Sequence, residues 1–241
     1  MFARMSAEEA VTIRPSHARA DISALAVWIV CAVLYAVLIW MVIYANPQLR
    51  GELGAMEQGQ NLFLATALVL MIALAVRADE KLFRYWMILL ALGTIYLLGE
   101  ETSWGQHYFG WGVSGVFEDI NDQGETNFHN ATSWLDQKPR AVLLFGMILG
   151  TIVHPLVKWA RKGRGLFDHP WWLAPTLASL PPVVFSQIGA LPERIDELRL
   201  FAFSLQLYRS SEMEEFFMYL FFVTYTLSLW KRMEARRRAG A

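Results

Sequence analysis

Six apolar runs constrain this chain more than any other feature of its sequence. Each run is close to the roughly 20 residues that a helix needs to cross the hydrocarbon core of a bilayer. Of the 241 residues, 55% are hydrophobic and only 18% are charged, which is typical of membrane proteins. The runs cover residues 22–44, 61–76, 83–99, 141–158, 171–190 and 213–230. The sequence therefore predicts an all-α, polytopic membrane protein with six transmembrane helices.

The distribution of basic residues predicts the orientation of these helices. With the N-terminus placed in the cytoplasm, 15 of the 21 Lys and Arg residues fall on the cytoplasmic side and 6 on the outer side. Cytoplasmic loops carry an excess of Lys and Arg. Both termini are therefore expected in the cytoplasm (N-in/C-in). We predict a multi-pass protein of a bacterial inner membrane, in contact with the lipid bilayer.

The chain shows no linker, low-complexity tract or internal repeat. We therefore predict a single membrane domain, 1–241. Its parts are a cytoplasmic tail (1–21), a six-helix bundle (22–230) and a cytoplasmic basic tail (231–241). The basic residues at 161–164 and in the C-terminal tail are interpreted as topology signals and contacts with anionic lipid, so nucleic acid is not a predicted partner.

Acidic residues follow the third apolar run directly, in the stretch GEETSWGQHYFGW. If the third helix continues past Glu101, four side chains share one of its faces: Glu100, Trp104, His107 and Tyr108. Glu101 then points about 100° away from that face. Only one of the two glutamates can face the centre of the bundle squarely.

A second polar stretch, FEDINDQGETNFHNATSWLDQ, follows on the outer side. Its DQGETNFHN segment predicts a turn leading into a short interfacial helix. In that helix Glu125 and His129 are four residues apart and share a face. A carboxylate and an imidazole at this spacing can chelate one metal ion, and they can equally form a hydrogen-bonded pair.

The third acidic group opens the sixth run. Glu212 and Glu215 share a helical face, and Glu214 lies beside them. Residues 192–208 show helical periodicity and predict an interfacial helix on the outer leaflet. Pro181–Pro182, in the middle of the fifth run, predicts a break or kink, which either leaves room for an interior cavity or is a structural kink packed by neighbouring helices.

The three acidic groups share a predicted depth, and the hypothesis is that they meet in one pocket at the outer face. Ionisable residues in or near spans usually face a bundle interior. The candidate catalytic residues are Glu100, Glu101 and Glu215. The candidate metal ligands are His107, Glu125, His129 and Glu212. The residues expected to orient substrate or ligands are Gln106, Asn121, Asn127 and Asn130.

Three kinds of chemistry fit this set. Carboxylates and imidazoles without thiolates suit a divalent metal such as Zn²⁺, Mn²⁺ or iron, with a further acid as general base. Crowded carboxylates also raise one another's pKa values and can do acid–base work without a metal. The same acids, amides and arginines can instead form a structural network that holds the outer loops.

The joint pattern of residues 99–130 resembles a group of bacterial multi-span membrane proteins. These carry Glu-Glu-x-x-Trp-Gly-Gln and then Asn-x-Gln-x-Glu-x-Asn-x-His-Asn. Here the matching positions are Glu100, Glu101, Trp104, Gly105, Gln106, Asn121, Gln123, Glu125, Asn127, His129 and Asn130. The resemblance implies a membrane protein and no particular activity.

Three functions remain open on the sequence. The leading hypothesis is a membrane-embedded enzyme whose outer carboxylate and histidine site acts on a lipid or another apolar substrate. The alternative is a non-catalytic membrane subunit that binds a partner membrane protein through its outer loops. The third is an ion- or proton-coupled transporter, which needs an ionisable path through the membrane.

Overall fold

The computed structural model describes residues 20–44, 54–120, 124–128, 133–162, 174–199 and 210–240, and within these ranges the chain is mostly helical and forms no strand. The long helices are α2 (Ala24–Tyr44), α3 (Ala55–Arg77), α4 (Lys81–Glu101), α7 (Ser133–Ile148), α9 (Leu180–Glu197) and α10 (Ser210–Gly240). The short ones are the 3₁₀ turns η2 (Ser103–Gly105) and η4 (Leu177–Ser179), the π-helical turn η3 (Leu149–Val153), α5 (Gln106–Phe109), α6 (Val116–Ile120) and α8 (His154–Ala160). The predicted all-α class is confirmed for these ranges.

Four helical segments are long and apolar enough to cross a membrane. They are α2, α3, α4 and the continuous segment Arg140–Ala160, which joins most of α7 to η3 and α8. They cover the first four predicted runs and indicate a membrane protein. The fifth and sixth runs correspond to α9 and α10, which are helical but fall outside this set of four.

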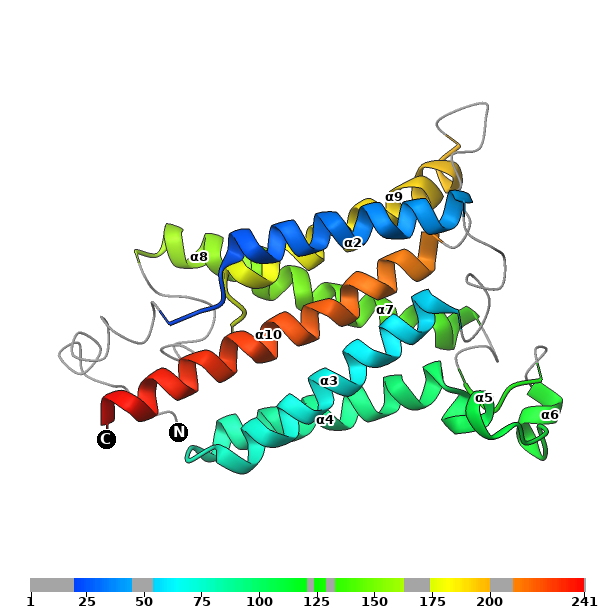
Figure 1. The fold of residues 1–241 in the computed structure, drawn as a ribbon, viewed down its shortest axis with the longest axis horizontal. Helices are drawn as coiled ribbons and strands as arrows, with labels where there is room; N and C mark the ends of the chain where they lie inside the picture. The colour runs from blue at the N-terminus through cyan, green and yellow to red at the C-terminus, as the bar shows by residue number, and fades with distance from the viewer. Residues whose placement is uncertain are drawn as a thin grey trace.

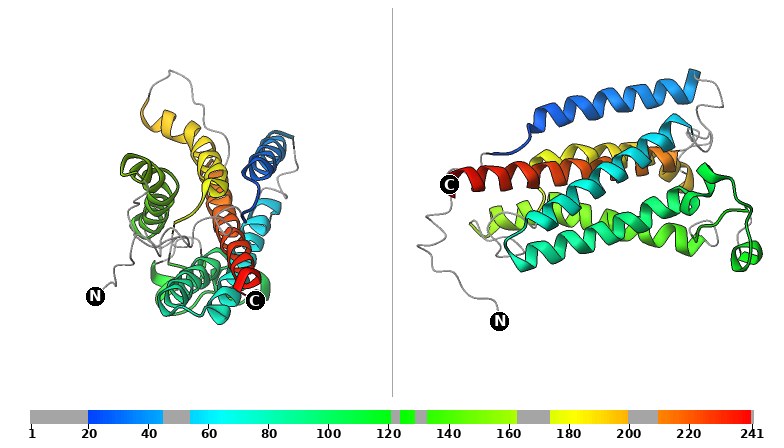
Figure 2. Two further views of the ribbon diagram at one scale, coloured as in Figure 1. Left: turned by 90° about the vertical axis from the view of Figure 1, so that its left-hand side faces the viewer. Right: turned by 60° about the horizontal axis from the view of Figure 1, so that its bottom comes forward.

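The long helices lie lengthwise and alternate in direction along the chain (Figure 1). α10 runs through the middle of the bundle, where it contacts α9, α3, α2 and α7 (Figure 2). α4 packs on α3, and α2 packs on α9. One end of the bundle carries α5 and α6, and the opposite end carries the α3–α4 turn and the C-terminal end of α10 (Figure 1).

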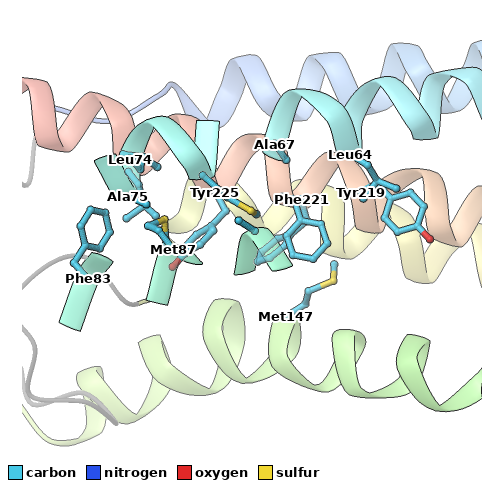
Figure 3. Close-up of a cluster of buried hydrophobic side chains, with 14 of the residues drawn as sticks. Leu64, Ala67, Leu74, Ala75, Phe83, Met87, Met147, Tyr219, Phe221 and Tyr225 are labelled. Carbon is cyan, nitrogen blue, oxygen red and sulfur yellow. The ribbon is translucent and has the colours of Figure 1, made fainter. Parts of the chain in front are cut away.

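The central position of α10 explains its polar composition. Figure 3 shows its side chains Tyr219, Phe221 and Tyr225 in a buried cluster between α3, α4 and α7. Because neighbouring helices cover α10, its hydroxyl groups do not need to face lipid. Thr226 donates its hydroxyl proton to the carbonyl of Phe222 at 2.7 Å. An interior helix of this kind needs less hydrophobicity than a lipid-facing one.

The prolines of the fifth run begin a helix instead of breaking one. Pro181 and Pro182 occupy the first turn of α9, directly after η4. The prediction of a break or kink in mid-span is therefore wrong. The first helical residues need no partner for their N–H groups, so proline is well tolerated there. Residues 171–173 of the predicted run lie outside the described residues.

The predicted separate helix over 192–208 is also not observed in its described part. Residues 192–197 continue α9 without interruption, and the helix ends in a turn at Leu198 and Arg199. Pro192 lies inside this helix. In the described part, the helical periodicity extends an existing helix as far as Glu197. Residues 200–208 lie outside the described ranges.

A glycine sets the close packing of α9 on α10. A Cβ atom added at Gly189 would lie 3.3 Å from the backbone nitrogen of Glu214 and 3.2 Å from the Cβ of Met213. Small residues at helix interfaces allow such close approach in membrane proteins. The backbone of α10 cannot move aside as a flexible side chain would.

We expect Gly189→Leu to lower the free energy of unfolding by about 1–3 kcal/mol through overpacking. Unfolding by SDS titration in mixed micelles measures this change. Gly93→Leu is the matched control, because nothing lies within 4 Å of a Cβ at that exposed position of α4. Equal stability of the two variants would contradict the close packing described here.

Candidate functional site

The end of α4 turns sharply instead of continuing. Ser103, Trp104 and Gly105 have φ angles of 46°, 54° and 102°, all in the left-handed region. Two consecutive non-glycine residues in that region are unusual, and surrounding contacts must hold them there. The third helix therefore ends at Glu101, and the condition under which four side chains would share one of its faces is not met.

Trp104 nevertheless contacts Glu100, by folding back over the end of α4. Its Nε1–H donates to Glu100 Oε1 at 2.9 Å. The ring lies where a Cβ on Gly99 would approach it to 3.0 Å, so glycine leaves the space for it. Tyr108, in α5, reaches α3 instead and donates to Gln58 Oε1 at 3.1 Å.

A short non-helical segment, residues 124–128, crosses this turn, and we call it the strap. Glu100 Oε2 accepts a hydrogen bond from the backbone N–H of Phe128 at 2.7 Å. Gln106 accepts one from the N–H of Thr126 at 2.7 Å and donates to the carbonyl of Gly124 at 3.0 Å. The predicted short helix around Glu125 is therefore wrong for these residues, because their backbone groups bond across to α4 and α5.

The strap carries Glu125 to His107. Glu125 Oε1 lies 3.2 Å from His107 Nε2. Glu125 Oε2 accepts from Asn127 Nδ2 at 2.6 Å and from the Ser103 hydroxyl at 3.2 Å. Asn127 also donates to Ser103 Oγ at 3.0 Å. Glu125, Asn127 and Ser103 are buried, and His107 retains 14% side-chain exposure.

These contacts favour one state of the imidazole. A carboxylate only accepts hydrogen bonds, so Nε2 of His107 carries the proton that is donated to Glu125. Nδ1 then bears the lone pair, and no hydrogen bond to Nδ1 is found among the described residues. Ser103 also lies 3.0 Å from Nε2. Because Ser103 and Glu125 contact the same ring nitrogen, the group is not a Ser-His-acid triad.

A second group of acids gathers around Glu101 and Tyr219, and we call it the inner acid cluster: Glu57, Glu101, Glu212 and Glu215. Glu101 accepts a hydrogen bond from the hydroxyl of Tyr219 at 2.6 Å. It also lies within electrostatic range of Glu57, Glu212 and Arg140. Glu215 forms an ion pair with Arg140 of α7. The cluster therefore joins α3, α4, α7 and α10.

Glu214 belongs to neither group. It pairs with Arg194 of α9 at 2.6 Å and accepts a hydrogen bond from Gln187 at 3.2 Å. This network ties α9 to α10 and is consistent with a structural role. Of the three acidic groups in the sequence, the first and third thus meet through Glu101, whereas Glu125 of the second meets His107 (Figure 1, the end with α5).

Metal binding finds no support in the described part of the chain. No group of three or more His, Cys, Asp or Glu side chains there could hold a metal ion. Of the predicted ligands, His107 and Glu125 contact each other, and Glu212 lies in the inner acid cluster. His129 lies outside the described residues, as do Asn121 and Asn130. Gln106 and Asn127 hold the strap.

Sequence reasoning missed several residues of these networks, among them Glu57, Gln60, Ser103, Arg140 and Tyr219. Gln60 donates to the backbone carbonyl of Glu212 at 2.9 Å and contacts its carboxylate. Glu57 and Gln60 lie just before an apolar run, as Glu100 lies just after one. This placement of polar residues at the end of an apolar run could have indicated them. Nothing in the local sequence distinguishes Ser103 or Tyr219.

Comparisons with known proteins do not assign the chain to a family. No protein-family model matches the chain, and no curated protein and no solved structure matches it. The residue contacts described above therefore carry the functional argument.

The strap gives a prediction about Glu100. A glutamine there keeps one acceptor oxygen but loses the other, so Glu100→Gln can satisfy only one of the N–H donors of Phe128 and Trp104. We expect the free energy of unfolding to fall by about 1–3 kcal/mol and the amide of Phe128 to exchange hydrogen faster. SDS titration and hydrogen exchange measure the two effects. The exposed Glu118→Gln is the control, and equal effects in the two variants would refute this role of Glu100.

Proposed function

We propose that this protein is a membrane-embedded enzyme in which His107 acts as a general base held by Glu125. The observation that carries the proposal is the 3.2 Å contact between His107 Nε2 and Glu125 Oε1. A carboxylate that fixes one ring nitrogen leaves the other oriented for proton transfer. The buried contacts of Glu125 with Ser103 and Asn127 support a fixed geometry. Metal is not required for this chemistry.

The proposed setting is a bacterial inner membrane with six spans, both termini in the cytoplasm and the site at the periplasmic face. The alternating helix directions in Figure 1 support this topology. The end opposite α5 and α6 is basic, with Arg77, Arg84 and Arg237 among its residues. An excess of Lys and Arg is the mark of a cytoplasmic side.

The proposed substrate is a lipid or another apolar molecule that reaches His107 from the membrane interface. Several exposed aromatic side chains lie close to His107 in the sequence or belong to the strap: Trp104, Tyr108, Phe109, Trp111 and Phe128. Phe109 is 78% exposed and stacks on Trp111 at a ring-centroid distance of 5.7 Å. Aromatic rings prefer the headgroup level of a bilayer, which supports a site at that depth.

Hydrolysis of an ester is the simplest reaction that needs only this base and water. His107 Nδ1 accepts a proton from water as the water oxygen bonds to the carbonyl carbon. The bond from that carbon to the alcohol oxygen then breaks, and the imidazolium returns its proton to the leaving alkoxide. The products are a carboxylic acid and an alcohol, and no other reactant is consumed.

The test is lipid turnover by the purified protein in nanodiscs made from a total bacterial lipid extract. We expect the wild type to accumulate free fatty acid or lysolipid, and Glu125→Gln to reduce the rate on the order of 10²-fold or more. Glu118→Gln serves as the exposed control and is expected to retain the wild-type rate. Absence of any lipid product from a folded wild type would overturn the proposal.

A partner-binding role is the second candidate, and the exposed Phe109–Trp111 stack favours it. Two large rings exposed on one short segment can contact a partner protein as well as lipid. A non-catalytic subunit would co-purify with its partner in mild detergent and lose it when both rings are replaced by Ser. A monomer that turns over lipid without any partner would exclude this role.

A further inference from the structure

The inner acid cluster is not used by the proposed chemistry at His107. Glu101 is half-buried, and its Oε1 accepts a hydrogen bond from the hydroxyl group of Tyr219. No hydrogen bond to Glu101 Oε2 is found in the part of the chain that the structure describes. Within the cluster Arg140 is paired with Glu215. The charged groups that act on Glu101 are the acids Glu57 of α3 and Glu212 of α10, together with Arg140 of α7.

A buried amide adds an acceptor to the same place. Gln60 of α3 is fully buried and donates through Nε2 to both the backbone and the side chain of Glu212, at 2.9 and 3.4 Å. These contacts fix the amide beside the Glu212 carboxylate. Gln60 Oε1 is buried and has no hydrogen-bond partner among the described residues. A buried polar atom without a partner costs free energy, so it calls for an explanation such as a ligand.

The geometry of the acceptors favours a hydrogen-bond donor over a metal ion. A divalent metal requires ligand oxygens about 2.0–2.6 Å from one point. No such set of three acidic or imidazole ligands is found in the described ranges. A primary ammonium group reaches its acceptors at about 2.7–2.9 Å through three N–H bonds and therefore accommodates a more open set of oxygens.

We propose that Glu101, Gln60 and Glu212 bind a primary ammonium group of a small molecule or a lipid headgroup. Gln60 Oε1 and Glu101 Oε2 accept two of its N–H bonds, and the Glu212 carboxylate supplies the third acceptor. The surrounding acids offset the positive charge. Glu101 and Glu212 each keep part of their surface exposed, whereas the oxygen of Gln60 is buried. The site is separate from His107 and does not depend on its activity.

The first experiment uses the wild-type protein in detergent and calorimetric titration with ethanolamine and choline. Ethanolamine is a primary ammonium with three donors, whereas choline has the same charge and no N–H. We expect ethanolamine to bind at least about tenfold more tightly than choline, because charge-assisted hydrogen bonds are lost in choline. Equal binding of the two, or tighter binding of Na⁺ than of ethanolamine, would overturn the proposal.

A second experiment, in nanodiscs, determines whether the ammonium group belongs to a lipid headgroup or to a soluble amine. Native mass spectrometry compares retention of phosphatidylethanolamine with retention of phosphatidylcholine. Selective retention of phosphatidylethanolamine identifies a lipid headgroup, and ethanolamine binding without it identifies a soluble amine. Both outcomes support the ammonium site, and failure of both refutes it. Neither result depends on lipid hydrolysis at His107.

Variants locate the site on the named residues. Glu101→Gln removes the charge with little change of shape, and Gln60→Met removes the buried acceptor. We expect each to weaken ethanolamine binding by about tenfold or more. Glu234→Gln is the control, since Glu234 pairs with Arg77 at the opposite end of α10. Unchanged binding in folded Glu101→Gln and Gln60→Met would overturn the assignment.

Discussion

Replacement of His107 by Ala is expected to lower kcat/KM for lipid ester hydrolysis by about 10²–10⁴-fold. A positioned general base contributes a factor of this size, and in the proposed mechanism the contact with Glu125 orients His107 for that role. The fold should survive the change, because His107 is half-buried and at the bundle end, and Ser103 keeps its bonds to Glu125 and Asn127. The measurement is the initial rate with a fluorogenic lipid ester in detergent micelles.

Added imidazole distinguishes a catalytic loss from a structural one. If His107 supplies only a proton-accepting ring, imidazole in solution should restore part of the activity of His107→Ala and should not accelerate the wild type. His154→Ala is the matched control, because His154 lies in α8 at the other end of the bundle. A His107→Ala variant with wild-type rates would remove His107 from the mechanism.

The helices were largely predictable from the sequence because lipid imposes a simple rule on length and apolarity. Runs that face lipid on one side, such as α2 and the Arg140–Ala160 segment, satisfy this rule directly. α10 satisfies it less well because other helices cover it, so its Thr and Tyr side chains face protein. Its sequence shows a helix but not its central position. That position depends on contacts with α3 and α9, which no local pattern records.

The candidate site was predictable by residue type and not by pairing. The positions of acids and histidines near the ends of apolar runs drew attention to Glu101, His107 and Glu125, each of which makes a hydrogen bond in the structure. Their partners depended on the left-handed turn at Ser103 and Trp104. Gly105 is the one residue there whose type indicates such a turn. An ideal helix through this turn would have aligned His107 with Glu100. The observed turn directs it to Glu125, 18 residues along the chain.

The adjacent glutamates illustrate that helix geometry gives the angle between two neighbouring side chains but not which of the two faces a particular helix. Glu100 binds the strap and Trp104, whereas Glu101 binds Tyr219 of α10. The approximate 100° between them was predictable. Which of the two faces α10 depends on how α4 is rotated against α3, and side-chain packing along both helices determines that rotation.

Asn127→Leu is expected to lower the free energy of unfolding by about 2–4 kcal/mol. Asn127 is fully buried and donates to the Glu125 carboxylate at 2.6 Å and to Ser103 Oγ at 3.0 Å. Leucine has a similar volume but no donor, so one charge-assisted and one neutral hydrogen bond are lost while Glu125 stays buried. The amides of Thr126 and Phe128 should exchange hydrogen faster as the strap loosens. SDS titration gives the free energy, and hydrogen exchange gives the local effect.

Asn61→Leu provides the matched control for the same chemical change. Asn61 in α3 makes one long hydrogen bond, 3.5 Å to the hydroxyl of Tyr108, and its Oδ1 is buried without a partner among the described residues. Removing an unsatisfied acceptor offsets the loss of a weak bond, so little change is expected. If Asn127→Leu were no more destabilising than Asn61→Leu, the strap would not depend on Asn127. His107 would then need another explanation for its fixed contact with Glu125, and the general-base proposal would lose its structural support.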